Sequence, residues 1–196
     1  MRRLLIAAIL SLLSVLPAYA IHTPMQQARQ VVVIIISGNP DVESSCSAVV
    51  ISPNVALTAA HCMVIPEPVL RREGSEGRPV VSYSTYPDKD VAVLVVPGIG
   101  CPCATQAPTA AEIDEVAYAI GYPLGIGNVL TVGHTQGRVV NPAENVEYLV
   151  ATCSVAPGNS GGGLFVVRDN KAYLVGIVVA TTIYGMPTFA VELWTL

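Results

Sequence analysis

One serine lies among four glycines in the stretch Pro157-Gly158-Asn159-Ser160-Gly161-Gly162-Gly163. Glycine lets the backbone approach other groups closely and adopt conformations that other residues avoid. Such a turn can direct backbone N–H groups at one point, which is what stabilising an oxyanion beside a nucleophilic serine requires. Taken alone, the stretch is equally compatible with a flexible turn between two strands.

A serine hydroxyl becomes a good nucleophile when an imidazole accepts its proton and a carboxylate orients that imidazole. The sequence offers both groups at the borders of apolar segments. His61 lies near the end of Leu57-Thr58-Ala59-Ala60-His61-Cys62, and Asp90 opens Asp90-Val91-Ala92-Val93-Leu94. Asp88 is the rival carboxylate nearby. Each segment alone also has a structural interpretation, as a satisfied histidine or as a turn that enters a strand.

The order of these residues distinguishes two serine hydrolase folds. Gly158-Asn159-Ser160-Gly161-Gly162 satisfies the G-x-S-x-G pattern of α/β-hydrolases, in which the histidine follows the serine. The histidines of this chain are His22, His61 and His134, and all of them precede Ser160. This excludes the α/β-hydrolase fold, whereas the order His, Asp, Ser is that of the chymotrypsin type.

The chain after residue 20 is predicted to be almost entirely β-structure. Short segments rich in Val, Ile, Tyr and Thr alternate with Gly, Pro, Asn and Ser clusters, which indicates a β-sandwich or a pair of barrels. Residues 66–79 are expected to form an exposed loop, and residues 109–115 at most one helical turn. The expected strands are Val31–Ile36, Ala48–Ile51, Val55–Thr58, Val91–Val96, Val116–Ile120, Val129–Val132, Arg138–Val140, Tyr148–Ala151, Gly163–Val167 and Tyr173–Ala180.

The three motifs together resemble the signature segments of trypsin/chymotrypsin-like serine proteases, most closely the bacterial branch that includes the HtrA-type and glutamyl endopeptidases. Ala119-Ile120-Gly121-Tyr122-Pro123 and Tyr173–Val178 resemble a turn and a cleft-lining strand of that branch. The resemblance implies an all-β fold of two packed six-stranded antiparallel barrels, with the active site in the cleft between them. It also implies a serine endopeptidase that forms an acyl-enzyme with protein or peptide substrates and uses no cofactor.

This fold divides the chain into four parts. Residues 1–20 precede the fold, residues 21–98 form the N-terminal barrel, residues 99–108 link the barrels, and residues 109–196 form the C-terminal barrel.

The resemblance also assigns roles to individual residues. His61 and Asp90 of the first barrel and Ser160 of the second are expected to form the catalytic triad. The N–H groups of Gly158 and Ser160 are expected to form the oxyanion hole.

Five cysteines are present. The resemblance implies a disulfide between Cys46 and Cys62, which would hold the histidine in place. The pairing of Cys101, Cys103 and Cys153 stays open.

The primary specificity pocket is also assigned by resemblance. Its expected walls contain no acidic side chain, and no histidine follows Ser160, so neither a basic nor an acidic substrate side chain would find a partner. We therefore expect cleavage after small or medium apolar residues, because burying an unpaired charge costs several kcal/mol. The expected lining residues are Ser154, Val155, Val178, Val179, Ala180 and Thr181, with Pro187 and Thr188 closing the pocket.

The first 20 residues have the pattern of a secretory signal peptide. Arg2 and Arg3 precede the apolar run Leu4–Leu16, and Ala18-Tyr19-Ala20 is a small-x-small cleavage site. The run is too short for a membrane span, which needs about 20 residues. We expect a secreted or periplasmic monomer, cleaved near Ala20 and without stable membrane insertion.

The charge balance and the cysteine spacing exclude other classes of function. Ten basic residues, two of them in the leader, stand against fourteen acidic ones. Without a Lys/Arg-rich patch, the protein has no electrostatic basis for binding nucleic acid or anionic lipid. No metal site is expected, because Cys101-Pro102-Cys103 lacks the spacing of zinc-binding pairs and no histidine lies near it in the sequence.

Two alternatives keep the same fold. The chain could be a catalytically silent binding protein, which a serine-directed probe would separate from a peptidase. The triad could instead serve an esterase or acyltransferase, which a peptide library would separate from a peptidase.

Overall fold

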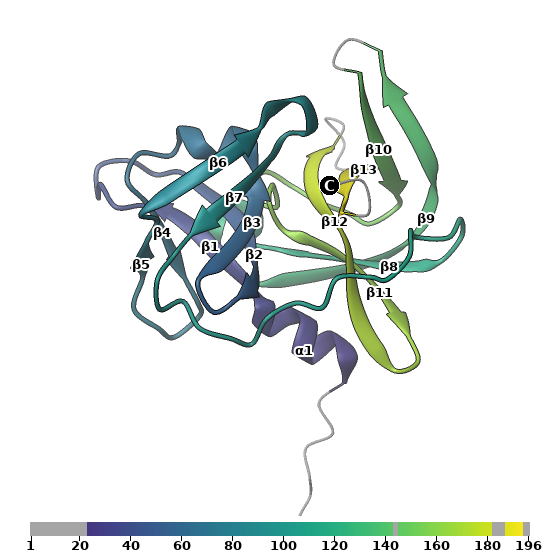
Figure 1. The fold of residues 1–196 in the computed structure, drawn as a ribbon, viewed down its shortest axis with the longest axis horizontal. Coiled ribbons are helices and arrows are strands. Elements are labelled where there is room, and N and C mark those ends of the chain that lie inside the picture. The colour runs from purple at the N-terminus through teal and green to yellow at the C-terminus, as the bar shows by residue number, and fades with distance from the viewer. Residues whose placement is uncertain (1–22, 143–144, 182–186, 194–196) are drawn as a thin grey trace, which may run out of the picture.

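The protein consists of two antiparallel sheets that stand beside each other, with one short helix below them (Figure 1). The structure is a computed structural model that describes residues 23–142, 145–181 and 187–193. The leader expected at residues 1–20 lies outside the described residues.

The described elements follow the chain in a simple order, helix first and then the two sheets. The helical elements are α1 (Pro24–Val31) and three short 3-10 helices, η1 (Ala60–Val64), η2 (Pro87–Lys89) and η3 (Pro123–Gly125). The strands of the first sheet are β1 (Val32–Ser37), β2 (Ser45–Ser52), β3 (Val55–Ala59), β4 (Pro68–Arg71), β5 (Arg78–Pro79), β6 (Ser82–Tyr86) and β7 (Val91–Val95). The strands of the second sheet are β8 (Val116–Gly121), β9 (Val129–Asn141), β10 (Val146–Ala151), β11 (Gly163–Arg168), β12 (Lys171–Thr181) and β13 (Thr188–Glu192).

The first sheet is a ring interrupted at one place. Its strand order is β5-β4-β1-β2-β3-β7-β6, so the two edge strands, β5 and β6, are consecutive in sequence. The two residues between them attach to opposite sides of the gap. The Val80 N–H donates to the Pro68 carbonyl of β4 over 2.9 Å, and the Val81 N–H donates to the Val95 carbonyl of β7 over 3.0 Å. One segment thus spans from β4 to β7 and completes the barrel-like shape.

The second sheet is a closed barrel with the order β10-β13-β12-β11-β8-β9. Strand β9 runs without a break over Val129–Asn141, where the sequence predicts two separate strands. The predicted all-β double-barrel fold is confirmed, with the difference that the first barrel uses seven short strands and remains open at one edge.

A shared hydrophobic core holds the two sheets together. Ile35 and Leu94 of the first sheet belong to the same buried cluster as Phe165 and Ile177 of the second. Helix α1 contributes Ala28 and Val31 to this cluster. Burying such side chains is the main favourable term in folding, so the same packing that stabilises the chain also fixes the position of one sheet against the other.

Helix α1 and strands β4 and β5 depart from the sequence predictions. Helix α1 begins at a capping box, in which Thr23 and Gln26 satisfy each other's backbone N–H groups. The predicted loop at residues 66–79 is wrong in part, because it contains β4 and β5. Strand β4 pairs with β1 and places Leu70 in the core with no exposed surface. Tertiary pairing overrides the charge and glycine content of the segment. Residues 109–115 form no helix.

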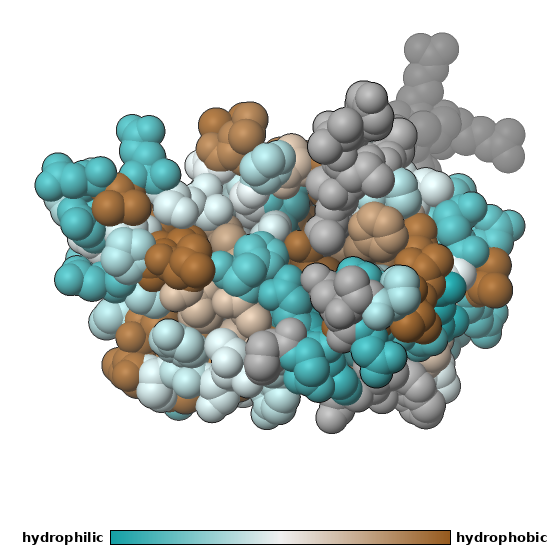
Figure 2. Space-filling model, turned by 90° about the horizontal axis from the view of Figure 1, so that it is seen from above, coloured by the Kyte–Doolittle hydropathy of each residue, from teal (hydrophilic) through white to brown (hydrophobic). Residues whose placement is uncertain are grey.

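Apolar side chains at the surface form separate groups among polar ones on the face shown in Figure 2. No helix of the described part is long and apolar enough to span a membrane.

Candidate active site

Strand register brings His61 and Asp90 together. Strands β3 and β7 are antiparallel, and Ala59 at the end of β3 pairs with Val91 at the start of β7. The chain beyond Ala59 therefore meets the chain that precedes Val91. The Ala60 N–H donates to the Asp90 carbonyl over 3.0 Å, directly beside the histidine.

The Asp90 carboxylate binds both the ring and the backbone of His61. Its Oδ2 lies 2.7 Å from Nδ1, and its Oδ1 accepts the His61 backbone N–H over 2.9 Å. The carboxylate as acceptor keeps the Nδ1 proton in place, which leaves Nε2 as the ring nitrogen that can accept another proton. Asp88, the rival carboxylate, is exposed in η2 and has no bond to His61 among the described residues.

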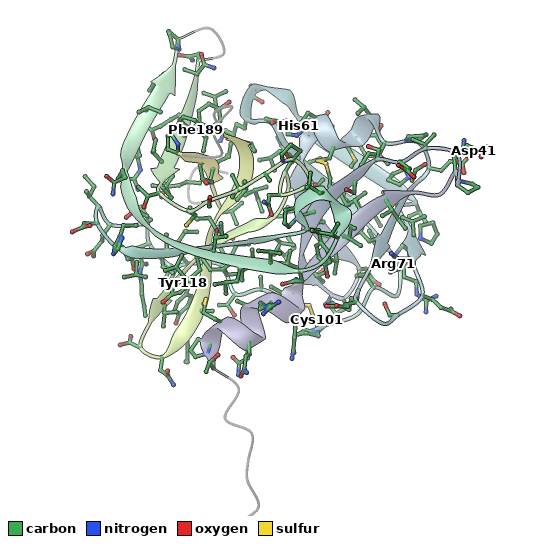
Figure 3. The ribbon with its side chains drawn as sticks, turned by 180° about the vertical axis from the view of Figure 1, so that it is seen from behind. Asp41, His61, Arg71, Cys101, Tyr118 and Phe189 are labelled. Atoms are coloured by element: carbon green, nitrogen blue, oxygen red, sulfur yellow. A yellow bond between two sulfur atoms is a disulfide. The ribbon has the colours of Figure 1, made fainter. Side chains whose placement is uncertain are left out.

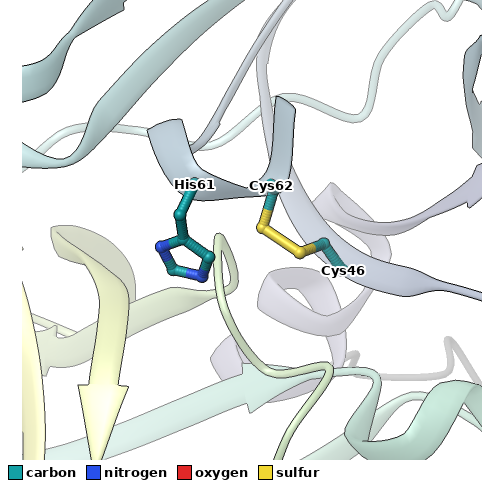
Figure 4. A group of neighbouring side chains, drawn as sticks. All are labelled: Cys46, His61 and Cys62. Carbon is teal, nitrogen blue, oxygen red and sulfur yellow. A yellow bond between two sulfur atoms is a disulfide. The ribbon is translucent and has the colours of Figure 1, made fainter. Parts of the chain in front are cut away.

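A disulfide ties the histidine turn to β2. Cys46 and Cys62 are bonded and buried, and Cys62 follows His61 directly in η1 (Figure 4). The structure thus contains the disulfide implied by the family resemblance. Ligand atoms of Cys46, His61 and Cys62 lie within 4.8 Å of one another. Both sulfurs are joined in the disulfide and are therefore not thiolate ligands, so this cluster does not form a metal site.

The Ser160 loop lies between the two sheets. On one side the Gly161 N–H donates to the Val178 carbonyl of β12 over 2.7 Å. On the other side the Ser47 N–H of β2 donates to the Ser160 carbonyl over 2.7 Å, and Cys62 Sγ lies 3.7 Å from the same oxygen. The structure therefore places the backbone of Ser160 beside the turn that carries His61.

Two backbone N–H groups of this loop are left without a partner among the described residues. The N–H groups of Asn159, Gly161 and Gly162 donate to the carbonyls of Ala156, Val178 and Asn159, respectively. Those of Gly158 and Ser160 donate to no described group. These are the two donors predicted to form the oxyanion hole. Gly158 and Ser160 are only partly buried, so both N–H groups are free to donate to an acceptor that arrives from solvent, as an oxyanion hole requires.

Gly158 and Gly161 occupy positions that no other residue fills easily. Their φ angles are 95° and 83°. A Cβ at Gly158 would lie 2.4 Å from the Tyr122 carbonyl oxygen, and one at Gly161 would lie 2.0 Å from the Ser47 carbonyl oxygen. Close backbone approach and left-handed conformation together explain these two glycines.

The side chains expected to line the specificity pocket are not all at the surface. Val155 and Val178 belong to the core of the second barrel, and Val179 belongs to the shared core. Ser154 is exposed, and Thr188 is buried and donates through Oγ1 to the Cys153 carbonyl. The side chains of Ala180 and Thr181 lie outside the described residues.

The structure shows the pairing of the three cysteines that the sequence leaves open. Cys101 and Cys103 form a second disulfide, and Cys101 lies far from His61 in Figure 3. Cys153 is a buried free thiol, and burial raises its pKa to about 11. It is therefore in the uncharged, unreactive form at neutral pH.

Sequence reasoning missed Ser47, which is bonded to the Ser160 loop at two points. Its Oγ donates to the Gly158 carbonyl over 2.7 Å, in addition to the backbone bond to Ser160. The available signal was its position directly after Cys46, which anchors the histidine turn.

The sequence of this chain matches a known protein family. Residues 46–177 match the family described as "Trypsin-like peptidase domain". A "Probable periplasmic serine endoprotease DegP-like" of Ectopseudomonas mendocina is 34% identical over 94 residues, which cover 46% of this chain and 19% of that protein. One of Pseudomonas putida is 33% identical over 96 residues, 47% of this chain and 20% of that protein. The matched segment thus spans about a fifth of the curated relatives.

Solved structures are similar over most of the chain. The HtrA-type protease AlgW with a tripeptide has a TM-score of 0.76 at 23% identity, covering 90% of this chain and 60% of that one. The active form of the Rv3671c protease from M. tuberculosis has a TM-score of 0.75 at 23% identity, covering 90% and 82%. At an identity of 23%, the similarity to these structures shows the fold alone.

Proposed function

The chain belongs to the family of trypsin-like peptidase domains, and on this basis we propose that it is a serine endopeptidase with His61, Asp90 and Ser160 as its triad. The observation that carries the proposal is the pairing of His61 Nδ1 with the Asp90 carboxylate at 2.7 Å, beside the loop that bears Ser160. The Gly158 and Ser160 N–H groups, which have no partner among the described residues, support the same assignment.

In the proposed reaction, Ser160 Oγ attacks the scissile carbonyl carbon while His61 Nε2 accepts the hydroxyl proton. Asp90 stabilises the imidazolium that forms, and the Gly158 and Ser160 N–H groups bind the oxyanion. His61 then returns the proton to the leaving amine, which produces an acyl-enzyme. A water molecule, activated by the same imidazole, hydrolyses the ester and restores Ser160.

The proposed substrates are proteins or peptides, and the proposed compartment is the periplasm or the cell exterior. The DegP-like relatives are described as periplasmic serine endoproteases, and residues 1–20 have the pattern of an export signal.

A serine-directed fluorophosphonate tests the assignment of the nucleophile. We expect one covalent adduct per chain, located at Ser160 by peptide mass spectrometry, because only a serine activated by a base reacts with such probes. Heat-denatured protein is the control and should remain unlabelled. A folded protein that takes up no probe would be a catalytically silent binding protein. Labelling without hydrolysis of any peptide in a library would favour an esterase or acyltransferase.

We further propose cleavage after Val, Ala, Leu or Ile. None of the residues expected around the primary pocket is acidic, and no histidine follows Ser160. An unpaired substrate charge would be buried there at a cost of several kcal/mol, whereas apolar surface gains about 25 cal/mol per Å². Cleavage-site profiling on a denatured proteome, with Ser160→Ala protein as the blank, should give these residues at the cleaved position. A profile dominated by Arg, Lys or Glu would overturn this specificity.

A further inference from the structure

All polar atoms of Ser47 have hydrogen-bond partners, and three of its four bonds cross from the first sheet to segments of the second half of the chain. Ser47 is fully buried in β2. Its Oγ lies 2.8 Å from the Tyr122 N–H and 2.7 Å from the Gly158 carbonyl oxygen. Its own N–H donates to the Ser160 carbonyl, and its carbonyl accepts the Thr58 hydroxyl over 2.7 Å. Ser47 therefore joins the histidine-bearing sheet to the nucleophile loop through its side chain as well as its backbone.

The direction of each bond to the Ser47 hydroxyl is fixed by chemistry. A hydroxyl has one proton to donate and two lone pairs to accept with. The Tyr122 N–H can only donate, so Ser47 Oγ accepts from it. The Gly158 carbonyl can only accept, so the hydroxyl proton goes to that oxygen. An alanine at this position would leave the buried Tyr122 N–H and the partly buried Gly158 carbonyl without this partner.

The two bonds of the Ser47 hydroxyl act on the segments on either side of the peptide unit that carries the Gly158 N–H. That N–H belongs to the planar peptide unit whose carbonyl is on Pro157, and in a trans peptide the two groups point in opposite directions. The Pro157 carbonyl accepts the Leu124 N–H over 2.7 Å, in the segment that Ser47 holds through Tyr122. The next peptide unit is held directly, through the Gly158 carbonyl. Gly158 has no side chain to restrict rotation, so these bonds restrict it instead.

We infer that the Ser47 hydroxyl is a positioning residue that orients the Gly158 N–H for the oxyanion. The inference rests on the proposed peptidase function. It predicts that loss of the hydroxyl affects the transition state more than the bound substrate, because the oxyanion exists only after attack.

The test compares Ser47→Ala with Thr58→Val in the full chain. Thr58→Val removes a neighbouring buried hydrogen bond to the Ser47 carbonyl but leaves the Ser47 hydroxyl in place. We expect Ser47→Ala to lower kcat about 10- to 100-fold with KM nearly unchanged, somewhat less than the roughly 10²–10³ lost with an oxyanion donor itself. Thr58→Val should keep kcat within about twofold. Fluorophosphonate labelling should slow in parallel with kcat in Ser47→Ala alone.

Hydrogen exchange of the peptide covering residues 156–163 provides a readout that needs no activity. It should be faster in Ser47→Ala than in wild-type protein and unchanged in Thr58→Val. If Ser47→Ala does not fold, Ser47→Cys takes its place, since the weaker thiol donor should produce the same changes to a smaller degree. Equal loss of kcat in both variants, or unchanged kcat and exchange in Ser47→Ala, would overturn the positioning role. A folded wild-type protein that hydrolyses nothing would refute the proposed function. The exchange experiment would still show whether the Ser47 hydroxyl holds the loop of residues 156–163 in place.

Discussion

Replacing Ser160 with alanine should lower kcat by about 10⁴- to 10⁶-fold, because no acyl-enzyme can form without the hydroxyl. The bonds that hold this residue in place come from its backbone, where its carbonyl accepts the Ser47 N–H. The variant should therefore fold normally and bind peptides nearly as well as wild-type protein. Steady-state kinetics on a peptide cleaved by the wild-type protein, together with thermal denaturation, provide the measurement.

Ser82→Ala is a matched control, since Ser82 is an exposed serine in β6 on the edge of the first sheet. It should leave kcat within about twofold. Retention of more than a few per cent of activity by Ser160→Ala would show that another group is the nucleophile.

Replacing Asp90 with asparagine should lower kcat by about 10⁴-fold. The carboxylate accepts two bonds, one from the His61 backbone N–H and one from Nδ1–H. An amide offers a single acceptor oxygen, and its NH₂ can only donate. If that oxygen keeps the backbone N–H, Nδ1 must become an acceptor, and the imidazole proton moves to Nε2, where it cannot assist Ser160. The backbone should tolerate the change, because asparagine also adopts the positive φ of 50° found at Asp90.

Asp88→Asn is the control for this prediction. Asp88 carries the same charge two residues earlier but is exposed in η2. Its loss should change kcat by less than about twofold, measured under the same conditions. A loss in Asp88→Asn as large as in Asp90→Asn would mean that the catalytic carboxylate has been misassigned.

The fold class was predictable because each decisive signal lies within a short segment. Strands such as Val55–Ala59 and Val91–Val95 are apolar runs bounded by turn residues. The motifs around His61, Asp90 and Ser160 are likewise local, and their order along the chain excluded the competing hydrolase fold. Helix α1 was not predicted, although Thr23 and Gln26 have the spacing of a capping box and Pro24 opens the helix.

Other features depend on partners far away in the sequence. Strand β4 forms because β1 is available to pair with it, and residues 66–79 themselves carry no strand pattern. The role of Ser47 arises from a contact with Gly158, 111 positions along the chain. The position of Ser47 directly after Cys46 is a local signal, but the contact with Gly158 itself cannot be read from the sequence. The disulfide between Cys101 and Cys103 could not be chosen over pairings with Cys153 until the burial of Cys153 in the second barrel was known.

The division of the site between two sheets has a consequence for synthesis. The pairing of His61 with Asp90 needs only the strands up to β7. The Ser160 loop is held by Val178, which follows Asp90 by 88 residues. At a translation rate of about 5–20 residues per second, roughly 4–18 s separate the appearance of these two residues. During that interval the growing chain contains His61 and Asp90 but lacks the strand that holds the Ser160 loop. A ribosome that stalls within it releases a chain without a complete site, so under the proposed function the order of the elements would delay activity until the second barrel is nearly complete.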